Sequence, residues 1–367
     1  MESDREDSYS EMSEENEYCV DNRKYVRYNG AHRMNVLCAF SMQCFVAVQK
    51  RDDAKMEGVT LKKISIDTFL RLRKLVFRSA RPLDYTMWKY LFENGSCDDF
   101  LSVLAAYQNE DGGFGYEIEC NNWNPHSSPY TVCIALDYLD VTGDQESGLK
   151  SRMIAGIIKY LSSGAYLLDD GWMGMQGIPD NNDFAHMPWF HYDAEKAAKA
   201  DIGVTKRLAD FILKYTDRDS NLYRKAEGLK ERYRQCGQVL LHGYPDYDPM
   251  ALNIEAYDPE TYPSWLPLPI YFIDSPDSSF YPECKGTVEK NLDTIIDTLL
   301  STHEFQIPSA EELDAFEKGT PHPDGKRWCV PEQTIGNYYW NSHFIIRDLD
   351  ILRKFGKLDF ELPVLIP

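Results

Sequence analysis

The chain lacks the cysteine spacing of a disulfide-bonded secreted protein, and it has no long hydrophobic run. Its nine cysteines include no Cys-x-x-Cys pair. That pattern is typical of free, buried thiols in a reducing cytoplasm. The most apolar stretch, residues 34–48, contains Asn35, Ser41 and Gln43 and is too short to cross a bilayer, so we interpret it as a segment docked on the protein. We therefore expect a cytoplasmic protein without a membrane span.

Basic residues are also scarce. Lys and Arg number 39 against 59 Asp and Glu, which gives a formal net charge of −20. This balance argues against a nucleic-acid binder, because phosphate backbones attract clusters of Lys and Arg. Part of the acidic excess lies in residues 1–17, which hold eight acidic residues and one arginine. We expect residues 1–18 to be a disordered, solubilising tail.

The most informative segment runs from Tyr107 to Glu119 and reads YQNEDGGFGYEIE. Apolar residues recur at helical spacing over residues 98–107 just before it. Asp111-Gly112-Gly113 ends that helix, because adjacent glycines adopt the positive φ angles of a tight reversal. Ser128 and Pro129 then form a strong helix start, as the N-cap and the first helical residue. The segment predicts a helix, a glycine turn and a second helix.

Related units recur along the chain. A helix predicted over residues 149–161 is followed by Asp169-Asp170-Gly171-Trp172, and one over residues 288–302 is followed, after a longer loop, by Asp324-Gly325-Lys326-Arg327-Trp328. Strand-like alternation is sparse, so the fold class is predicted to be all-α. Because one helix pair cannot bury its apolar stripe alone, such units must stack or close into a ring. Other helices are predicted over residues 65–77, 84–92, 204–215 and 344–355.

Residues 104–114, LAAYQNEDGGF, resemble the QW-type motif of terpenoid cyclases and the glycine-rich turns of protein prenyltransferase β subunits. Phe114 stands where those motifs usually carry tryptophan. More of the chain resembles a family of bacterial proteins described as prenyltransferase-like or uncharacterised. The segments that carry this resemblance are residues 79–83, 106–119, 127–129, 186–190 and 349–358.

The resemblance implies an α/α toroid, a ring of inner and outer helices around an apolar central cavity. We assign the toroid to residues 61–360, with residues 19–60 as an N-terminal extension and residues 361–367 as a C-terminal tail. Two segments rich in proline and aromatic residues, 243–277 and 306–331, are predicted to be long ordered loops on one rim of the ring. The sequence indicates no oligomeric state.

The acidic clusters of well-known enzymes with this fold are missing. No Asp-x-Asp-Asp cluster is present to protonate an alkene. The nearest motifs are Asp246-Tyr247-Asp248 and Asp348-Leu349-Asp350, and the aspartates of the second are predicted to face water from a helix. No Asp-Asp-x-x-Asp row is present to bind magnesium and a diphosphate. The available zinc ligands, Cys284, Cys329, His303 and His343, do not match the expected spacing. The sequence therefore predicts no metal and no cofactor.

A weaker group of polar and aromatic residues remains as a candidate site. Glu117 and Glu119 follow the glycine turn and point to the same side if the backbone there is extended. Together with Asp183 and His186 they are the predicted catalytic residues, because a carboxyl group in an apolar setting and an imidazole suit acid–base chemistry. The predicted substrate-binding residues are Phe114, Tyr116, Trp172, Trp189 and His191.

A structural role is the alternative for several of these residues. Phe114 and Trp172 also suit packing in the core, and Gln108 and Asp111 suit capping of the turn. Three functions therefore stay open. The first is an enzyme that acts on an isoprenoid or other lipid-like small molecule by acid–base chemistry. The second is a carbohydrate-active α/α toroid with paired carboxylates, and the third is a binding or scaffold protein without catalysis.

Overall fold

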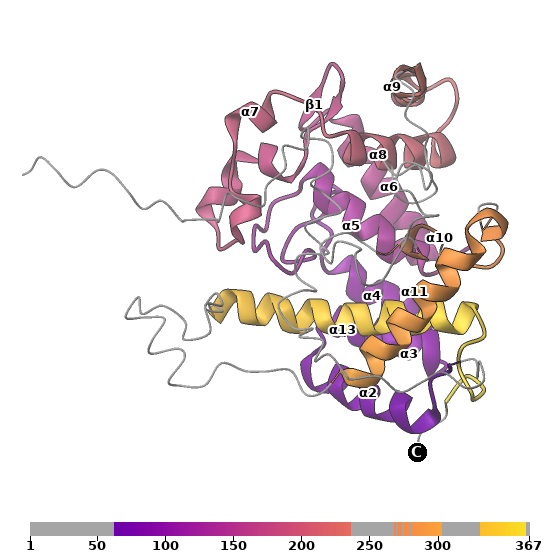
Figure 1. The fold of residues 1–367 in the computed structure, drawn as a ribbon. Coiled ribbons are helices and arrows are strands. Elements are labelled where there is room, and N and C mark those ends of the chain that lie inside the picture. The colour runs from indigo at the N-terminus through magenta and orange to yellow at the C-terminus, as the bar shows by residue number, and fades with distance from the viewer. Residues whose placement is uncertain are drawn as a thin grey trace, which may run out of the picture.

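The computed structural model describes residues 62–235, 268, 270–273, 275–278, 281–302 and 331–364. Within these residues the fold is all-α, as predicted, and its strands are one short hairpin, β1 (Leu167–Leu168) paired with β2 (Gly171–Trp172) (Figure 1). No helix in the described ranges is long and apolar enough to cross a membrane.

The α-helices are α2 (Ile66–Ser79), α3 (Pro82–Phe92), α4 (Cys97–Ala105), α5 (Pro129–Asp140), α6 (Gly148–Ser162), α7 (Ala194–Ala197), α8 (Ile202–Tyr215), α9 (Asn221–Gln235), α10 (Ile270–Ile273), α11 (Tyr281–Ser301) and α13 (Pro331–Lys354). Three short 3-10 helices are η2 (Met175–Gly177), η3 (Pro179–Asp183) and η4 (Pro188–Phe190).

Helix starts follow the local sequence closely. The predicted start of α5 is confirmed: the Ser128 hydroxyl accepts the Thr131 N–H, and the Thr131 hydroxyl accepts the Ser128 N–H. This capping box satisfies backbone donors that a helix start leaves free. Ser65 and Asp201 cap α2 and α8 in the same way, each accepting one backbone N–H with its side chain.

The glycine turn after α4 joins three helices. The Gln108 amide donates to the Gly112 oxygen at 2.9 Å and to the Met153 oxygen in α6 at 3.1 Å. Asp111 Oδ1 accepts the Gly113 N–H and the Ser127 hydroxyl, both at 2.8 Å, just before α5. The predicted capping roles of Gln108 and Asp111 are therefore confirmed. The turn fixes the end of α4 against α5 and α6.

The second predicted unit differs from the first. After α6 the chain forms the β1–β2 hairpin rather than a turn into another helix, and Gly171 has a φ of +141°. The Trp172 N–H donates to the Thr205 hydroxyl in α8 at 2.8 Å, so the hairpin packs on α8. The third predicted unit, residues 324–328, lies outside the described residues. So do the predicted tail 1–18, the extension 19–60, the segment 34–48 and most of the loops 243–277 and 306–331.

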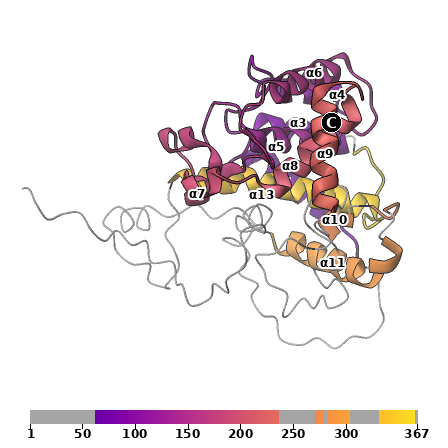
Figure 2. The ribbon, with the colours of Figure 1, turned by 90° about the horizontal axis from the view of Figure 1, so that it is seen from above.

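The last long helix lies against the first two. α13 packs on α2 and α3, and α11 covers the opposite side of α13 (Figures 1 and 2). Other helix pairs that pack together are α3 with α4, α4 with α5 and α6, α5 with α6 and α8, α8 with α9, and α10 with α11. The two ends of the described chain also meet. The Ile64 N–H donates to the Lys357 oxygen at 2.9 Å, and the Asp359 N–H donates to the Ile64 oxygen at 3.1 Å.

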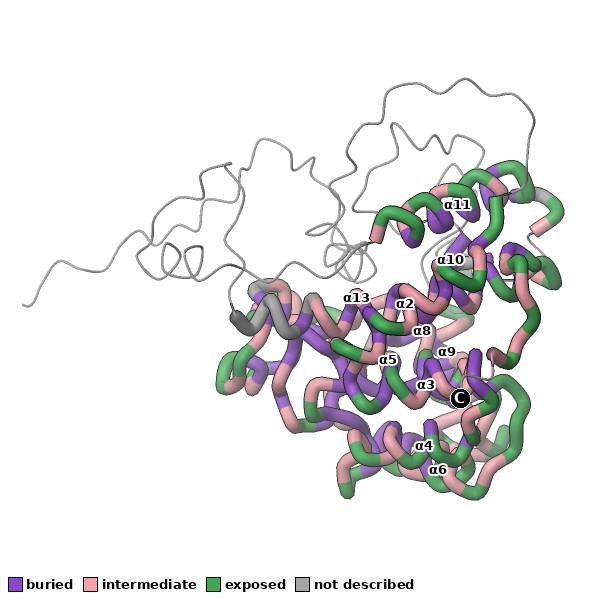
Figure 3. Tube along the Cα trace, turned by 90° about the horizontal axis from the view of Figure 1, so that it is seen from below, coloured by how far each residue is buried: buried purple, intermediate pink, exposed green. Residues whose placement is uncertain are grey.

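Two helix starts were predicted too late. α11 begins at Tyr281 rather than at residue 288, and α13 begins at Pro331 rather than at residue 344. The early part of α13 is polar and aromatic, so it has no apolar stripe of helical period. It is helical because it packs on other parts of the fold: Gly336 lies so close to Asn121 that a β-carbon there would collide with it. α11 is buried on one side and exposed on the other, as its apolar stripe predicts (Figure 3).

The prediction that both aspartates of Asp348-Leu349-Asp350 face water is wrong for the first of them. Asp348 is buried, and its Oδ1 accepts the Tyr271 hydroxyl of α10 at 3.0 Å. Burial raises the pKa of Asp348 to about 6. The sequence pattern failed here because α10 covers this side of α13, and the pattern within α13 contains no information about that contact.

Candidate functional site

The loop after the glycine turn carries the two predicted catalytic glutamates. Tyr116 and Glu117 have φ angles of 55° and 59°, in the left-handed region that residues with a β-carbon seldom adopt. Glu117 is therefore not extended, and the assumption that placed both carboxyl groups on one side does not hold. Glu117 is half-buried, whereas Glu119 is only 2% exposed. Strain of this kind persists only where surrounding contacts fix the backbone.

Arg81 supplies those contacts. It is the N-cap residue of α3, and its guanidinium is buried. Nη1 donates to the backbone oxygens of Glu117 at 2.6 Å and of Ile118 at 3.1 Å. Nε donates to Asp84 Oδ2 at 2.9 Å. Burial lowers the pKa of Arg81, but the neighbouring Asp84 carboxylate outweighs this effect and raises it, so the side chain stays charged.

Glu119 is a buried carboxyl group with few hydrogen bonds to stabilise its ionised form. The Asn121 N–H donates to its Oε2 at 3.0 Å, and the Asn121 amide approaches Oε1 at 3.4 Å. Burial raises the pKa of Glu119 to about 7, although the Asn121 N–H and the charge of Arg81 both favour the ionised form. A carboxyl group in this state is present in both its acid and its base form near neutral pH.

Asp84, Tyr138 and His343 extend the network from Arg81 to α13. The Tyr138 hydroxyl accepts from Arg81 Nη2 at 2.7 Å and donates to Asp84 Oδ1 at 3.0 Å. Nδ1 of His343 lies 3.1 Å from the same Asp84 oxygen. Burial raises the pKa of Asp84, but Arg81 and His343 outweigh it and hold the value at about 2. Burial also lowers the pKa of His343, and Asp84 offsets only part of this.

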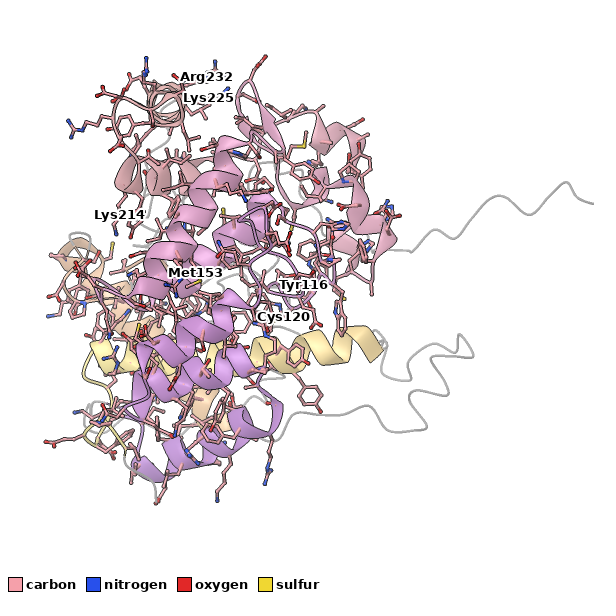
Figure 4. The ribbon with its side chains drawn as sticks, turned by 180° about the vertical axis from the view of Figure 1, so that it is seen from behind. Tyr116, Cys120, Met153, Lys214, Lys225 and Arg232 are labelled. Atoms are coloured by element: carbon pink, nitrogen blue, oxygen red, sulfur yellow. The ribbon has the colours of Figure 1, made fainter. Side chains whose placement is uncertain are left out.

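Aromatic side chains of α13 form one wall of the site. Trp340 and Phe344 stack with ring centroids 5.2 Å apart and bury Cys120 between the loop and the helix. Figure 4 shows Cys120 beside α13, with Tyr116 in the same loop. Tyr116 is 55% exposed. The Trp340 indole lowers the pKa of Glu119, but its N–H has no acceptor in good hydrogen-bonding geometry within the described part of the chain.

The predicted site residues around His186 lie beside the loop that carries Glu119. The Met187 N–H donates to the Asn121 oxygen at 2.9 Å, and Asn122 forms a backbone bridge with His186. The buried Asn181 supports this contact by accepting from the Asn122 amide at 3.0 Å. The structure thus brings the His186 segment to the residues that follow Glu119.

The predicted side chains of this segment differ in exposure. His186 is half-buried, its ring stacks on that of His191, and its Nδ1 lies 2.8 Å from the Phe184 oxygen. Asp183 and His191 are exposed, and Trp189 is half-buried against the main hydrophobic core.

Phe114 and Trp172 lie inside the main hydrophobic core, and both are 0% exposed. This position fits their alternative role in packing. The Phe114 oxygen accepts the Thr131 hydroxyl at 2.6 Å, which links the glycine turn to α5. Neither side chain reaches the surface of the described part of the molecule.

Four residues of the site were not predicted as members of it: Arg81, Asp84, Tyr138 and His343, the last of which was considered only as a zinc ligand. Only Arg81 lies in a segment that carries the family resemblance, residues 79–83. His343 follows Trp340 by three residues in the polar start of α13, a spacing that places both on one helix face. A prediction that this segment is helical would have placed His343 beside Trp340.

No cluster of three or more His, Cys, Asp or Glu side chains that could hold a metal occurs in the described ranges. Comparison of the chain with protein-family models, curated proteins and solved structures found no match. The resemblance to prenyltransferase-like proteins therefore stays a prediction, and the geometry of the site has to carry the functional argument.

Proposed function

We propose that the protein is an acid–base enzyme in which Glu119 donates a proton to an apolar substrate. The observation that carries this proposal is a carboxyl group that is 2% exposed and has a pKa raised to about 7 by burial. A proton donor works best when its pKa lies near the working pH. Arg81 and Asn121 hold the loop around Glu119, so the carboxyl group has a fixed position.

The surroundings of Glu119 favour an unsaturated, lipid-like substrate such as an isoprenoid. Transfer of the proton from the Glu119 carboxyl group to an alkene carbon forms a C–H bond, and it leaves a carbocation and a carboxylate. Aromatic faces attract such a cation, and Trp340 and Phe344 lie beside the loop of Glu119. A buried carboxylate adds further electrostatic stabilisation.

We also propose that the helices form an α/α toroid. Three observations support a closed arrangement. α3 to α6 pack as successive neighbours and α5 continues to α8 and α9, α13 packs on α2 and α3, and Ile64 pairs with the residues around Leu358. In a closed ring the loop of Glu119 and the aromatic face of α13 would line the central space. This is the position that the substrate of such an enzyme requires.

The test is a substrate screen in deuterated water. We would incubate the purified chain with prenyl diphosphates of several lengths, with polyprenyl alcohols and with a glycan panel, and detect products and deuterium uptake by mass spectrometry. Glu119→Gln should reduce turnover by about 100-fold or more, because loss of a positioned proton donor costs that much. Glu110→Gln, at an exposed residue of the same turn, is the matched control and should keep full turnover. Equal turnover by wild type and Glu119→Gln would overturn the proposal.

A non-catalytic binding protein is the second candidate. The observation in its favour is that Arg81, Asp84 and Tyr138 satisfy one another by hydrogen bonds, as they would in a purely structural network. This candidate predicts binding of a lipid-like probe without any product. Turnover of glycans alone would instead favour the carbohydrate-active alternative.

A further inference from the structure

Asp84 and His343 have the geometry of a carboxylate–imidazole pair. Asp84 Oδ1 lies 3.1 Å from His343 Nδ1, and the Asp84 side chain is 0% exposed. Arg81 keeps Asp84 ionised through its Nε contact at 2.9 Å. A carboxylate that is ionised and buried accepts hydrogen bonds and donates none. The contact with His343 is therefore favourable only if Nδ1 carries a proton.

The second contact of Nδ1 agrees with this assignment. The Tyr138 oxygen lies 3.2 Å from Nδ1, but its hydroxyl donates to Asp84 Oδ1, because a carboxylate is the stronger acceptor, and Arg81 Nη2 donates to the Tyr138 oxygen. Tyr138 thus has no hydrogen left to donate to an unprotonated Nδ1. With the Nδ1 proton fixed, the neutral imidazole of His343 presents the lone pair of Nε2.

The neighbours of His343 favour its neutral form. Among the described residues, the charged or titratable side chains that act on it include Asp84, Arg81, Tyr138 and, on its own helix, Arg347. Burial and the two arginines disfavour the imidazolium, and Asp84 favours it. Trp340 and Phe344 contact the ring through their aromatic faces. The side chain keeps 19% exposure, so protons can exchange with solvent.

We infer that Nε2 of His343 is the proton acceptor that completes the reaction begun by Glu119, with Asp84, Tyr138 and Arg81 as positioning residues. This inference rests on the proposed function. The two groups share Trp340 as a neighbour: the ring of His343 is 5.4 Å from that of Trp340, and the indole acts on Glu119. Arg81 connects both groups, because it contacts Asp84 and the Glu117 backbone.

Glu119 and His343 together account for every proton that the proposed reaction moves. Glu119 gives its proton to the substrate and becomes a carboxylate. The carbocation then loses a proton from an adjacent carbon to Nε2, which restores a C=C bond and leaves an imidazolium opposite Asp84. Transfer of this proton to solvent and uptake of another by Glu119 reset the site. The substrate gains and loses one proton, so the net reaction is an isomerisation or cyclisation.

The first experiment is independent of turnover. Proton-coupled nitrogen NMR on the full chain labelled at histidine reports which ring nitrogen carries the proton, and His343→Gln assigns the signal. We expect a neutral imidazole at pH 7 with the proton on Nδ1, and a loss of this tautomer preference in Asp84→Asn. A proton on Nε2, or an imidazolium at pH 7, would overturn the inference whatever the outcome of the substrate screen.

The second experiment compares variants on whichever substrate the screen identifies. His343→Gln should lower turnover by about 100-fold, and it should remove the fall of kcat at low pH that protonation of a base causes. His126→Gln is the matched control, because His126 also pairs with an aspartate, Asp180, at 2.6 Å but is exposed. Loss of turnover in Glu119→Gln with full turnover in His343→Gln would overturn the inference and leave the proposed function standing. Full turnover in both variants would reject the proposed function itself.

If no tested substrate is converted, diethyl pyrocarbonate supplies the readout. This reagent acylates a neutral imidazole nitrogen that carries a lone pair. Peptide mapping should find His343 modified in the wild type in a reaction that slows as pH falls through the pKa of the imidazole. An unmodified His343 beside a modified His126 would show that Nε2 is not an accessible base and would overturn the inference.

Discussion

Arg81 and Asp84 form an ion pair of 2.9 Å in which the two side chains are only 3% and 0% exposed. The pair lies at the start of α3, and each partner reaches a different part of the chain. Arg81 holds the backbone of Glu117, and Asp84 holds the imidazole of His343 in α13. One ion pair thus fixes the relative positions of the loop with the two glutamates and the helix with the aromatic wall.

The first prediction concerns this ion pair. Asp84→Ala should lower the free energy of unfolding by about 3 to 5 kcal/mol, because it leaves the guanidinium of Arg81 buried and unpaired. Chemical denaturation at neutral pH measures the effect. Lys62→Ala is the control, since the ion pair of Lys62 with Asp297 is exposed on both sides, and it should change stability by less than about 1 kcal/mol. Similar losses in both variants would contradict the importance of burial here.

The second prediction concerns the pH dependence of stability. The pKa of Glu119 rises from 4.5 to about 7 on folding, so the folded state holds the proton more tightly. The resulting stabilisation is complete below pH 4.5 and is lost as pH rises through 7. Glu119→Gln should match the wild type near pH 4 and exceed it by up to about 3 kcal/mol at pH 8, at about 1.4 kcal/mol per pKa unit. Denaturation at several pH values tests this, and a pH-independent difference would refute the raised pKa.

The third prediction concerns the glycine turn. Gly112 has a φ of +95°, and a β-carbon there would collide with the backbone oxygen of Gly156 in α6. Gly112→Ala should lower the free energy of unfolding by about 2 to 5 kcal/mol, because the strain of a left-handed backbone and the overpacking add together. Gly143 also has a positive φ, +53°, but a β-carbon there meets no atom within 4 Å. Gly143→Ala should therefore cost only the strain, about 1 to 2 kcal/mol. Thermal unfolding of both variants separates the two contributions.

The fourth prediction concerns the cap of α5. Ser128→Ala should lower stability by about 1 kcal/mol through loss of the N-cap. Thr131→Val should cost more, because the Thr131 hydroxyl also donates to the buried Phe114 oxygen at 2.6 Å. Ser102→Ala, on the exposed side of α4, is a suitable comparison and should be nearly neutral. An equal effect at Ser102 would argue against a specific role for the capping box.

Local structure was largely predictable because its causes lie close together in the sequence. Ser128 and Pro129 start α5 through contacts within one helical turn, and Gly356 ends α13 with a φ of +64°. The start of α13 was missed because packing, rather than an apolar stripe, makes those residues helical. Glu119 was predicted as a candidate in an apolar setting, but its contact with Trp340 of α13 was not, because that helix lies far away in the sequence.

The sequence by itself determined the all-α character, most helix ends and the glycine turn, since these depend on side chains and backbone within a few residues. Only the tertiary structure decided the chemistry of the site. Asp84 and His343 are 259 residues apart in the chain, and their contact exists because α13 packs on α3. The raised pKa of Glu119 likewise follows from the exclusion of water from its carboxyl group in the folded protein. Burial and charge are properties of the folded neighbourhood, and no pattern within either segment contains them.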